Sequence, residues 1–339
     1  MNHESPFYIC HFLRIKLQFR FNSEVHFIGM ESNVYTDGEH SECSERTVQL
    51  KNPHLGNMDE DVLYHLALGS KSHDLEEMFG DVKFVCMGGT PSRMKTFAYH
   101  IMDVLDYKLP VGAVISEITN YRFSLYKVGP VLSISHGMGV PSIGILLHEI
   151  IKLLYHAKAK DPVIFRIGTS GGIGVESGTV VISDNAVDGL GNHFYEVAVL
   201  GKIVRRPATF NMELIEQLKS CVDPNDSYET VTGTTMCAND FYEGQGRLDG
   251  AICDHSENEK MEYLAQLRER GVVNIEMEAT VFAALTHHTG IRAAIVCTTL
   301  IDRLQGDQVM VTKDQMEEWQ RRPQKLVGEY IKRSLQKKL

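Results

Sequence analysis

The sequence predicts an α/β fold with a mixed or parallel sheet. From Pro53 onward, short apolar runs that suit strands alternate with segments of helical periodicity. Several of these runs end in glycine-rich turns, as strands do at the ligand-binding edge of such sheets. The chain has 339 residues, of which 43% are hydrophobic and 23% charged, so it can bury a large core without disulfides or a structural metal.

The first 51 residues differ from the remainder, and we expect a disordered or loosely attached extension there, with a single folded domain over residues 52–339. Residues 8–30 mix aromatic and basic side chains and lack the apolar core and cleavage site of a secretory signal. Residues 31–46 are polar and rich in Ser, Glu and Asn. Met30 is a candidate alternative start.

Within the domain, strands are expected where β-branched and aromatic residues gather between turn signals. The expected strands are 82–87, 123–128, 131–135, 163–167, 180–183, 230–236, 272–276 and 293–300. The expected helices are 59–67, 142–155, 211–221, 257–270, 279–287 and 315–335. The helix at 142–155 is apolar on most faces, so we expect the domain or a second subunit to cover it.

Composition narrows the classes of partner. With 34 basic and 44 acidic residues the formal charge is −10, which disfavours a broad nucleic-acid surface. The seven cysteines are odd in number and form no Cys-x-x-Cys pair, which argues against a disulfide framework or zinc ribbon and favours a reducing, cytoplasmic compartment. The most apolar stretch, 143–155, is interrupted by His148, Glu149 and Lys152, so we expect no membrane span.

The stretch DPVIFRIGTSGGIG, residues 161–174, is the first candidate site. Arg166 interrupts a strand that a glycine-rich turn follows. Such a turn brings backbone N–H groups close to an anion, and the arginine adds a bidentate cation. The alternative is that Arg166 pairs with a carboxylate and the glycines only make a tight turn; this stretch alone leaves both open.

Two further strands end in the same way. GGTPSR (88–93) follows the strand at 82–87, and HGMGVPS (136–142) follows the strand at 131–135. Three such junctions, two with an arginine, would surround one anion if the strands are neighbours. None matches Gly-x-x-x-x-Gly-Lys-[Ser/Thr], so the anion is expected to be phosphate, sulfate or a phosphorylated sugar.

Two other segments suit the remaining parts of a ligand. In EME (276–278) the carboxylates can accept hydrogen bonds from sugar hydroxyls and Met277 offers an apolar face, although Glu278 also fits an ordinary first helical turn. In FYEGQGRLDG (241–250) Gln245 and Arg247 suit a planar heterocycle with two carbonyls, and Phe241 can lie against its face, although a solvated loop is the commoner outcome.

Together these motifs resemble the nucleoside phosphorylase family. The resemblance rests on SHGMGVPSIGI (135–145) with Glu149, on GTSGG (168–172) and on EME (276–278). The segment 241–250 is similar to the pyrimidine-recognition segment of the animal uridine phosphorylases. The resemblance runs from about Asn52 to the C-terminus and implies a single three-layer α/β/α domain with a central mixed sheet.

The resemblance also implies a role for individual residues. Arg166, Arg247 and Glu278 would be the catalytic residues, and no residue would bind a metal. Phosphate would be bound by Gly89, Arg93, Arg166, Thr169 and, from a partner subunit, Arg122. Ribose would be bound by Glu276, Met277, Glu278 and, from the partner, His65. Uracil would be bound by Gly171, Phe241, Gln245, Arg247, Leu300 and Ile301.

The activity implied is reversible phosphorolysis of uridine, with deoxyuridine as a further substrate, to uracil and ribose 1-phosphate in pyrimidine nucleoside salvage and catabolism. Inorganic phosphate would be a co-substrate, no cofactor is needed, and a homodimer would share its active sites. A purine nucleoside phosphorylase is one alternative, since purine-specific relatives carry an aspartate near Asp302. A nucleosidase of the same fold would have no use for Arg93 and Arg166. A non-catalytic uridine-binding protein is the alternative from another class.

Overall fold

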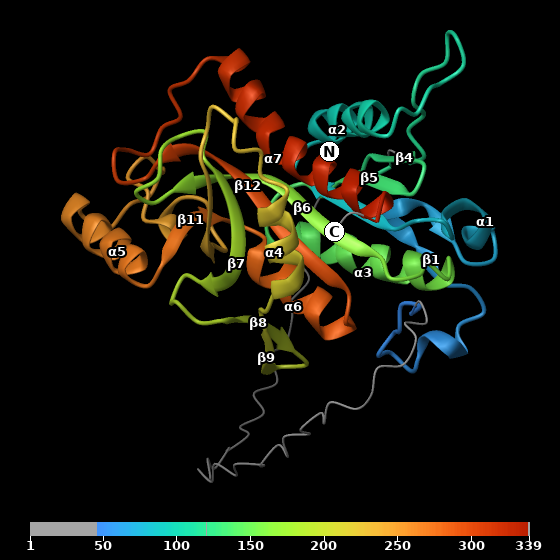
Figure 1. Ribbon diagram of the computed structural model, residues 1–339. Helices are drawn as coiled ribbons and strands as arrows, with labels where there is room; N and C mark the ends of the chain where they lie inside the picture. Colours follow the sequence, from blue (N-terminus) through green and yellow to red (C-terminus); the bar gives the residue numbers. More distant parts are fainter. Residues whose placement is uncertain (1–45, 120, 338–339) are drawn as a thin grey trace, which may run out of the picture. The chain divides into compact units, whose positions relative to one another are not determined.

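The computed structural model describes residues 46–119 and 121–337 (Figure 1). Most of the extension predicted for residues 1–51 therefore lies outside the described residues. The six residues that precede the predicted boundary are described and contact the domain. The amide of Arg46 donates to Asp161 Oδ2 at 3.1 Å, Thr47 pairs with Lys160, and Val48 is buried in the main core.

An eight-stranded sheet runs through the domain. Its order is β11 (Val272–Glu276), β10 (Thr230–Cys237), β7 (Val180–Asp188), β12 (Arg292–Asp302), β6 (Val163–Gly172), β3 (Phe84–Gly88), β5 (Val131–Ser135) and β4 (Leu125–Val128). The pairs β4–β5 and β7–β12 are antiparallel and most others are parallel, which confirms the predicted mixed sheet. The sheet curls back on itself, because β11 also pairs with the end of β6 through Asn274 and Gly172.

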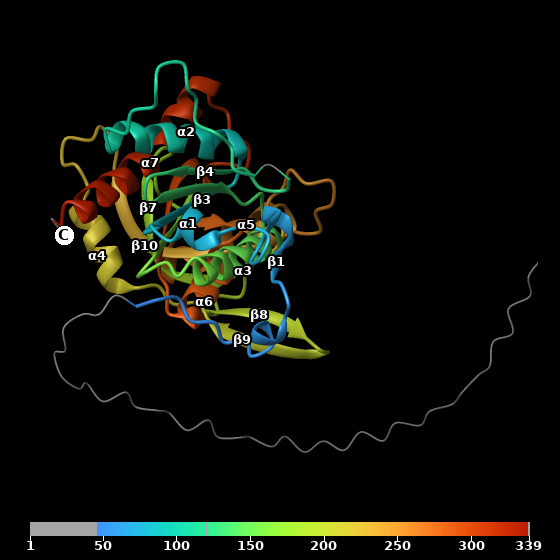
Figure 2. The same cartoon turned by 90° about the vertical axis from the view of Figure 1, so that its right-hand side faces the viewer.

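Helices cover both faces of the sheet and give the predicted three layers (Figures 1 and 2). On one face α7 (Lys313–Leu335) contacts α2 (Pro91–Val104) and α4 (Met212–Ser220). On the other, α3 (Val140–His156) packs on α6 (Ala279–Thr289) and α1 (Leu75–Phe79). The helix α5 (Glu257–Glu269) packs on β11, and the hairpin of β8 (Phe194–Val199) and β9 (Lys202–Pro207) packs on α6.

Most predicted elements are present with shifted ends, and the helix predicted at 142–155 is α3. Most of its apolar side chains are covered by the domain, since Ile143, Leu147 and Leu154 are fully buried, but Ile145 is 41% exposed. The helix predicted at 59–67 is wrong. The chain forms β1 (Val62–Leu63), the 3-10 turn η2 (Tyr64–Leu66) and β2 (Leu68–Gly69), because the Glu149 carboxylate takes the backbone N–H groups that helix continuation would need.

Two further differences from the predicted secondary structure affect segments that carry predicted site residues. The segment 168–172, predicted as a glycine-rich turn, continues strand β6, because β12 is longer than predicted and pairs with it as far as Gly172. After β3, Arg93 lies in the first turn of α2, which the sequence analysis did not predict. Thr90 caps this helix by accepting from the Arg93 amide, and Pro91 begins it, which are both ordinary signals of a helix start.

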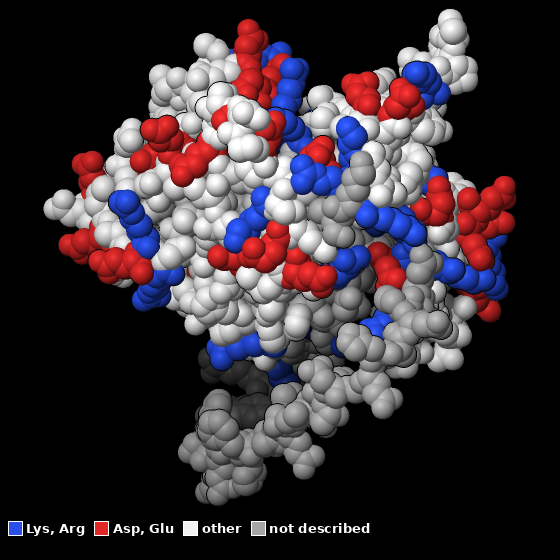
Figure 3. Space-filling view, viewed as in Figure 1, with Lys and Arg blue, Asp and Glu red and all other residues white. Residues whose placement is uncertain are grey.

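The described part of the chain contains no helix that is both long and apolar enough to cross a bilayer. On the face that Figure 3 shows, acidic and basic side chains are interspersed, with no extended field of either sign.

Candidate active site

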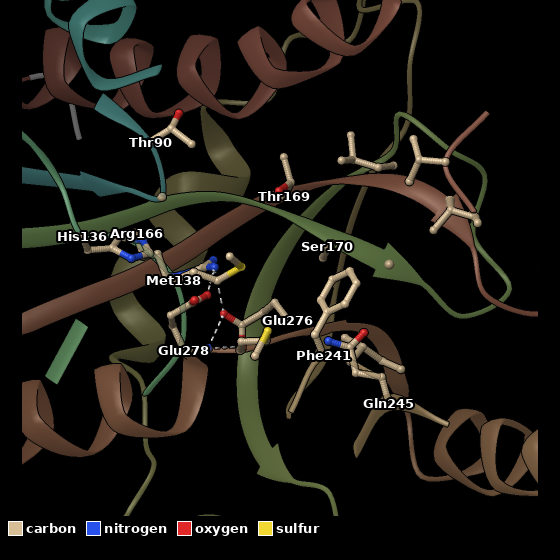
Figure 4. A pocket seen from close by; sticks show the side chains of 18 of the residues that line it. Thr90, His136, Met138, Arg166, Thr169, Ser170, Phe241, Gln245, Glu276 and Glu278 are labelled. Carbon is tan, nitrogen blue, oxygen red and sulfur yellow. Dashed lines mark hydrogen bonds and ion pairs between the residues drawn. The ribbon is translucent and has the colours of Figure 1, made fainter. Parts of the chain in front are cut away.

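A pocket opens where the ends of β3, β5, β6, β11 and β12 meet (Figure 4). Several of its side chains fall into two groups. His136, Arg166, Glu276 and Glu278 lie together at one end, whereas Phe241 and Gln245 lie at the other (Figure 4). This is the arrangement that the converging strand ends lead one to expect, since ligands in α/β sheets bind outside the carboxyl ends of strands.

Arg166 is the centre of the charged end, and it is 4% exposed. Its Nη2 lies 3.1 Å from Glu276 Oε2 and also pairs with the Glu278 carboxylate, while Nη1 donates to Cys297 Sγ at 2.9 Å. The pairing with carboxylates that the sequence left open is therefore present. It does not exclude an anion nearby, because Arg166 also lines the pocket.

The surroundings shift the pKa values of the two glutamates in opposite directions. Burial raises the pKa of Glu276, and the negative charge of Glu278 raises it further, against the opposing effect of Arg166. For Glu278, burial also favours the neutral form. The Arg166 charge and the amide of Gly139, which donates at 2.6 Å, nevertheless lower its pKa overall. Glu278 is thus ionised at neutral pH and can accept hydrogen bonds from ligand hydroxyls.

Arg93 adds a second cation to this end. Its Nε donates to Gln320 Oε1 at 3.0 Å, which fixes the guanidinium from the side of α7. Burial lowers the pKa of Arg93 to about 10, and the charge of Arg166 contributes to the shift. Arg93 is partly buried and the charge of the buried Arg166 destabilises its own, so a bound anion would stabilise the charged form of Arg93. Gly89 keeps this corner open, because a Cβ there would come within 3.2 Å of the Gly137 carbonyl.

His136 also faces the charged end and was not predicted as a site residue. It is 1% exposed, and neither ring nitrogen has a hydrogen-bond partner among the residues that the structure describes. Burial lowers its pKa to about 3, so the ring is neutral at physiological pH. An unpaired buried imidazole on a pocket wall is a free donor and acceptor for a bound ligand.

The opposite end presents a ring and two polar side chains. The guanidinium carbon of Arg247 lies 4.4 Å from the centre of the Phe241 ring. Arg247 Nε and Nη2 donate to the Asp249 carboxylate at 2.9 and 2.8 Å. Arg303 Nη1 donates to Gln245 Oε1 at 3.3 Å, which fixes the orientation of the side-chain amide and leaves its N–H groups for a ligand.

The structure brings most of the predicted site together. Every residue named from the sequence lines this pocket except His65 and Arg122, the two expected from a partner subunit. In this chain His65 Nδ1 lies 2.7 Å from Glu149 Oε1, and Arg122 is exposed. Their contribution to a neighbouring site stays a prediction.

Other residues line the pocket that the sequence reasoning did not name. They are Thr90, His136, Gly137, Met138, Ser170, Ile275, Arg303 and Val309. Thr90 and the 136–138 loop belong to junctions already singled out, so the signal for them was present. Arg303 and Val309 follow β12 in a segment whose residue types give no such signal.

Two observations concern ligands other than a pyrimidine nucleoside and phosphate, namely a purine base and a metal ion. The Asp302 carboxylate accepts from the amides of Gly174 and Leu304 at 3.0 and 3.1 Å, so local backbone groups hold it. Over the described ranges, no three His, Cys, Asp or Glu side chains gather closely enough to hold a metal ion.

Comparison with known proteins gives a consistent result. Residues 83–332 match the family model described as the phosphorylase superfamily. The chain is 50% identical to uridine phosphorylase 1 of Mus musculus over 88% of this chain and 96% of that protein, and 52% identical to uridine phosphorylase 2 of Homo sapiens over 86% and 92%. Crystalline uridine phosphorylase of Schistosoma mansoni in complex with thymidine superposes with a TM-score of 0.80 at 42% identity, over 85% of this chain and 99% of that one.

One relative shows that the fold does not guarantee turnover. The inactive uridine phosphorylase B of Schistosoma mansoni is 42% identical over 85% of this chain and 97% of its own length. Membership of the family therefore rests on the whole length of the match, while activity rests on the site. The pocket geometry, the family model and the extent of these matches agree: the chain belongs to the phosphorylase superfamily and, within it, to the uridine phosphorylases.

Proposed function

We propose that this protein catalyses the reversible phosphorolysis of uridine to uracil and ribose 1-phosphate. Inorganic phosphate is the co-substrate and no cofactor takes part. The observation that carries the proposal is the division of one pocket into an end with two arginines, Arg93 and Arg166, and an end with Phe241, Gln245 and Arg247. An anion and a pyrimidine at these ends would place the sugar between them.

The phosphate lies at the charged end. We assign it to Gly89, Arg93, Arg166 and Thr169, which all line that part of the pocket. Arg166 already pairs with Glu276 and Glu278, so one guanidinium would serve both the carboxylates and the phosphate. The mutual repulsion of Arg93 and Arg166 favours a dianion over water here.

The ribose lies over the middle of the pocket. Glu278 is ionised and accepts hydrogen bonds from the sugar hydroxyls, with Met277 against the ring and Glu276 nearby. The role of Glu278 is to orient the sugar for attack rather than to transfer a proton. That role is consistent with its lowered pKa, since a carboxylate that stays ionised is a poor general acid.

The base lies at the far end. Phe241 covers one face, and Gly171, Leu300 and Ile301 complete the enclosure. Gln245 offers its amide N–H to a base carbonyl. Arg247 is held by Asp249 and by the Asp307 carbonyl through Nε and Nη2, which leaves Nη1 without a protein partner in the described part of the chain.

The reaction is a displacement at C1′. A phosphate oxygen forms the new bond to C1′ as the bond from C1′ to N1 of uracil breaks, and both electrons of that bond stay on the base. The uracil anion then takes up a proton that balances the one that hydrogen phosphate loses on becoming the ester. The arginines stabilise the phosphate beneath the cationic sugar, and Gln245 and Arg247 stabilise the anionic base.

We further propose a homodimer with shared sites, in which His65 and Arg122 of each chain complete the site of the other. The contact of His65 Nδ1 with Glu149 supports this, because it fixes the ring and leaves Nε2 for a group outside the chain. The buried free thiols of Cys86, Cys237 and Cys297 support a reducing compartment such as the cytoplasm, where pyrimidine salvage would take place.

The test is release of uracil from uridine by the purified protein, with and without inorganic phosphate, beside deoxyuridine, thymidine and inosine. Release that requires phosphate and excludes inosine supports the proposal. Release without phosphate would make the protein a hydrolase, and inosine cleavage would make it a purine enzyme. Binding of uridine without turnover would place it with non-catalytic relatives.

A further inference from the structure

Behind the base end of the pocket lies a cluster of charged side chains centred on Asp307. Lys260 Nζ donates to Asp307 Oδ1 at 2.9 Å, and Arg303 Nη2 lies 2.9 Å from the same oxygen. Arg247 donates to the Asp307 carbonyl and pairs with Asp249 at 2.8 Å. The cluster therefore ties α5, the segment after η3 (Glu243–Gln245) and the segment after β12 into one unit.

The charges in this cluster do not cancel. Its three cations, Arg247, Lys260 and Arg303, face two carboxylates, Asp249 and Asp307. The hydrogen bond from Arg247 lowers the pKa of Asp249. Burial alone would raise the pKa of Asp307, but its hydrogen bonds and the neighbouring cations lower it overall. Both carboxylates are therefore ionised at neutral pH, and one positive charge is in excess.

This excess charge sits where solvent screens it poorly. Arg303, Lys260 and Arg247 are 1%, 5% and 8% exposed. Arg247 and Arg303 line the pocket, whereas Lys260 lines a neighbouring cavity behind them. Apart from the half-buried Asp188, the acidic side chains that line that cavity are exposed, so water screens them more strongly than the buried cluster.

We propose that Lys260 is a positioning residue for the departing base. By neutralising Asp307 it leaves Arg247 and Arg303 with an uncompensated positive charge, which stabilises the electron pair that uracil carries away when the bond to C1′ breaks. Lys260 acts through Asp307 and does not touch the substrate. This inference rests on the proposed function, because only a reaction that releases an anionic base would use such a charge.

The test compares leaving groups. Fluorine at C5 stabilises the uracil anion. Cleavage of 5-fluorouridine therefore needs less stabilisation of the leaving base by the protein than cleavage of uridine does. Lys260→Met is expected to lower kcat/KM for uridine by about tenfold, the scale of one charge acting across a partly buried site. The same variant is expected to lower kcat/KM for 5-fluorouridine by about threefold or less, because the fluorinated base needs less stabilisation of its negative charge by the protein.

Two variants keep the comparison interpretable. Lys260→Arg retains the charge and is expected to hold both substrates near wild-type values. Lys325→Met removes a lysine that also pairs with aspartates, Asp223 and Asp226, but on the outer side of α7, and is expected to change neither. If Lys260→Met does not fold, Lys260→Gln is neutral and carries the same expectation.

Equal losses for uridine and 5-fluorouridine in Lys260→Met would overturn the inference, because misplaced side chains slow both reactions alike. A loss in Lys260→Arg as large as in Lys260→Met would overturn it too. Failure of the wild-type protein to turn over uridine would instead refute the proposed function. The two failures are therefore distinguishable in one set of assays.

Discussion

At the scale of single residues, Arg247 shows how a side chain acquires a role from its neighbours. Its guanidinium lies over the Phe241 ring and donates two hydrogen bonds to Asp249. These contacts hold it in one orientation, whereas the guanidinium of an exposed arginine changes its orientation freely. Such a fixed donor is already oriented when negative charge develops on the base. Preorganised donors of this kind make large differences to rate, because no reorganisation is needed at the transition state.

Arg247→Ala is therefore expected to lower kcat for uridine by about 10²–10³, as the loss of one oriented donor does elsewhere. Arg205→Ala is the matched control. Arg205 also stacks on a phenylalanine, Phe194, and pairs with Glu196, but it is exposed on the β8–β9 hairpin. Steady-state phosphorolysis assays measure kcat for both variants. A similar loss in the two variants would mean that the effect is not specific to the pocket.

His136 gives a prediction about stability and pH. Its pKa falls from 6.5 in the unfolded chain to about 3 in the folded one because it is buried. Between these values the unfolded state binds the proton and the folded state does not, so the free energy of unfolding must decrease as pH falls from 6.5 towards 3.

His136→Phe is expected to remove this part of the dependence and to flatten the acid side of the stability curve. Urea unfolding at a series of pH values measures it, with His100→Phe as a comparison, because burial also lowers the pKa of the half-buried His100. Parallel curves for wild type and His136→Phe would contradict the assignment of a neutral ring.

At the scale of elements, strand β6 carries both ends of the site. Its register against β12 runs through Thr169 and on to Gly171 and Gly172. Arg166, Thr169 and Gly171, to which we assign phosphate and base binding, are thereby set at fixed spacings on one extended backbone. A loop at 168–172 would have left these positions free to move relative to one another.

The glycines of β6 also make room for the functional side chains. A Cβ on Gly168 would come within 2.4 Å of Arg166 Nη1 and 3.0 Å of Cys297 Sγ. Gly168→Ala is therefore expected to displace the Arg166 guanidinium and to raise KM for phosphate at least about tenfold, with a loss of stability of about 1–3 kcal/mol.

Gly56→Ala is the control, since nothing lies within 4 Å of a Cβ at that position. Phosphate titrations at fixed uridine and thermal unfolding measure the two effects. An unchanged KM for phosphate in Gly168→Ala would show that the position of Arg166 is not decisive for the anion.

At the scale of the whole molecule, the site of one chain is incomplete without His65 and Arg122 under the proposed dimer. The closed arrangement of a two-fold dimer makes the exchange mutual, because each surface meets the same surface of the partner. Two variants with defects on opposite sides of the shared site should therefore complement each other.

Arg166→Ala and Arg122→Ala are each expected to be nearly inactive alone. In a mixed dimer one site carries both defects and the other carries neither, so the mixed dimer should have about half of the wild-type activity. Co-expression with two affinity tags, followed by assay of the doubly purified dimer, measures it. Activity of Arg122→Ala alone near wild type would refute the shared site.

The sequence by itself determined the α/β class, most strands and helices and more than half of the pocket's residues. It did so because apolar periodicity, turn residues and the motifs around Arg166, Arg247 and Glu278 are local properties of the chain. The turn at 64–66 was not predicted, because it is stabilised by a distant residue. The buried carboxylate of Glu149, in another helix, accepts hydrogen bonds from the backbone amides of this turn.

Only the tertiary structure decided the pairing of Arg166 with both glutamates, the neutral state of His136 and the cluster around Asp307. Each depends on burial and on partners more than a hundred residues away or in another element. Desolvation and charge–charge interactions act across space rather than along the chain, so no local pattern records them.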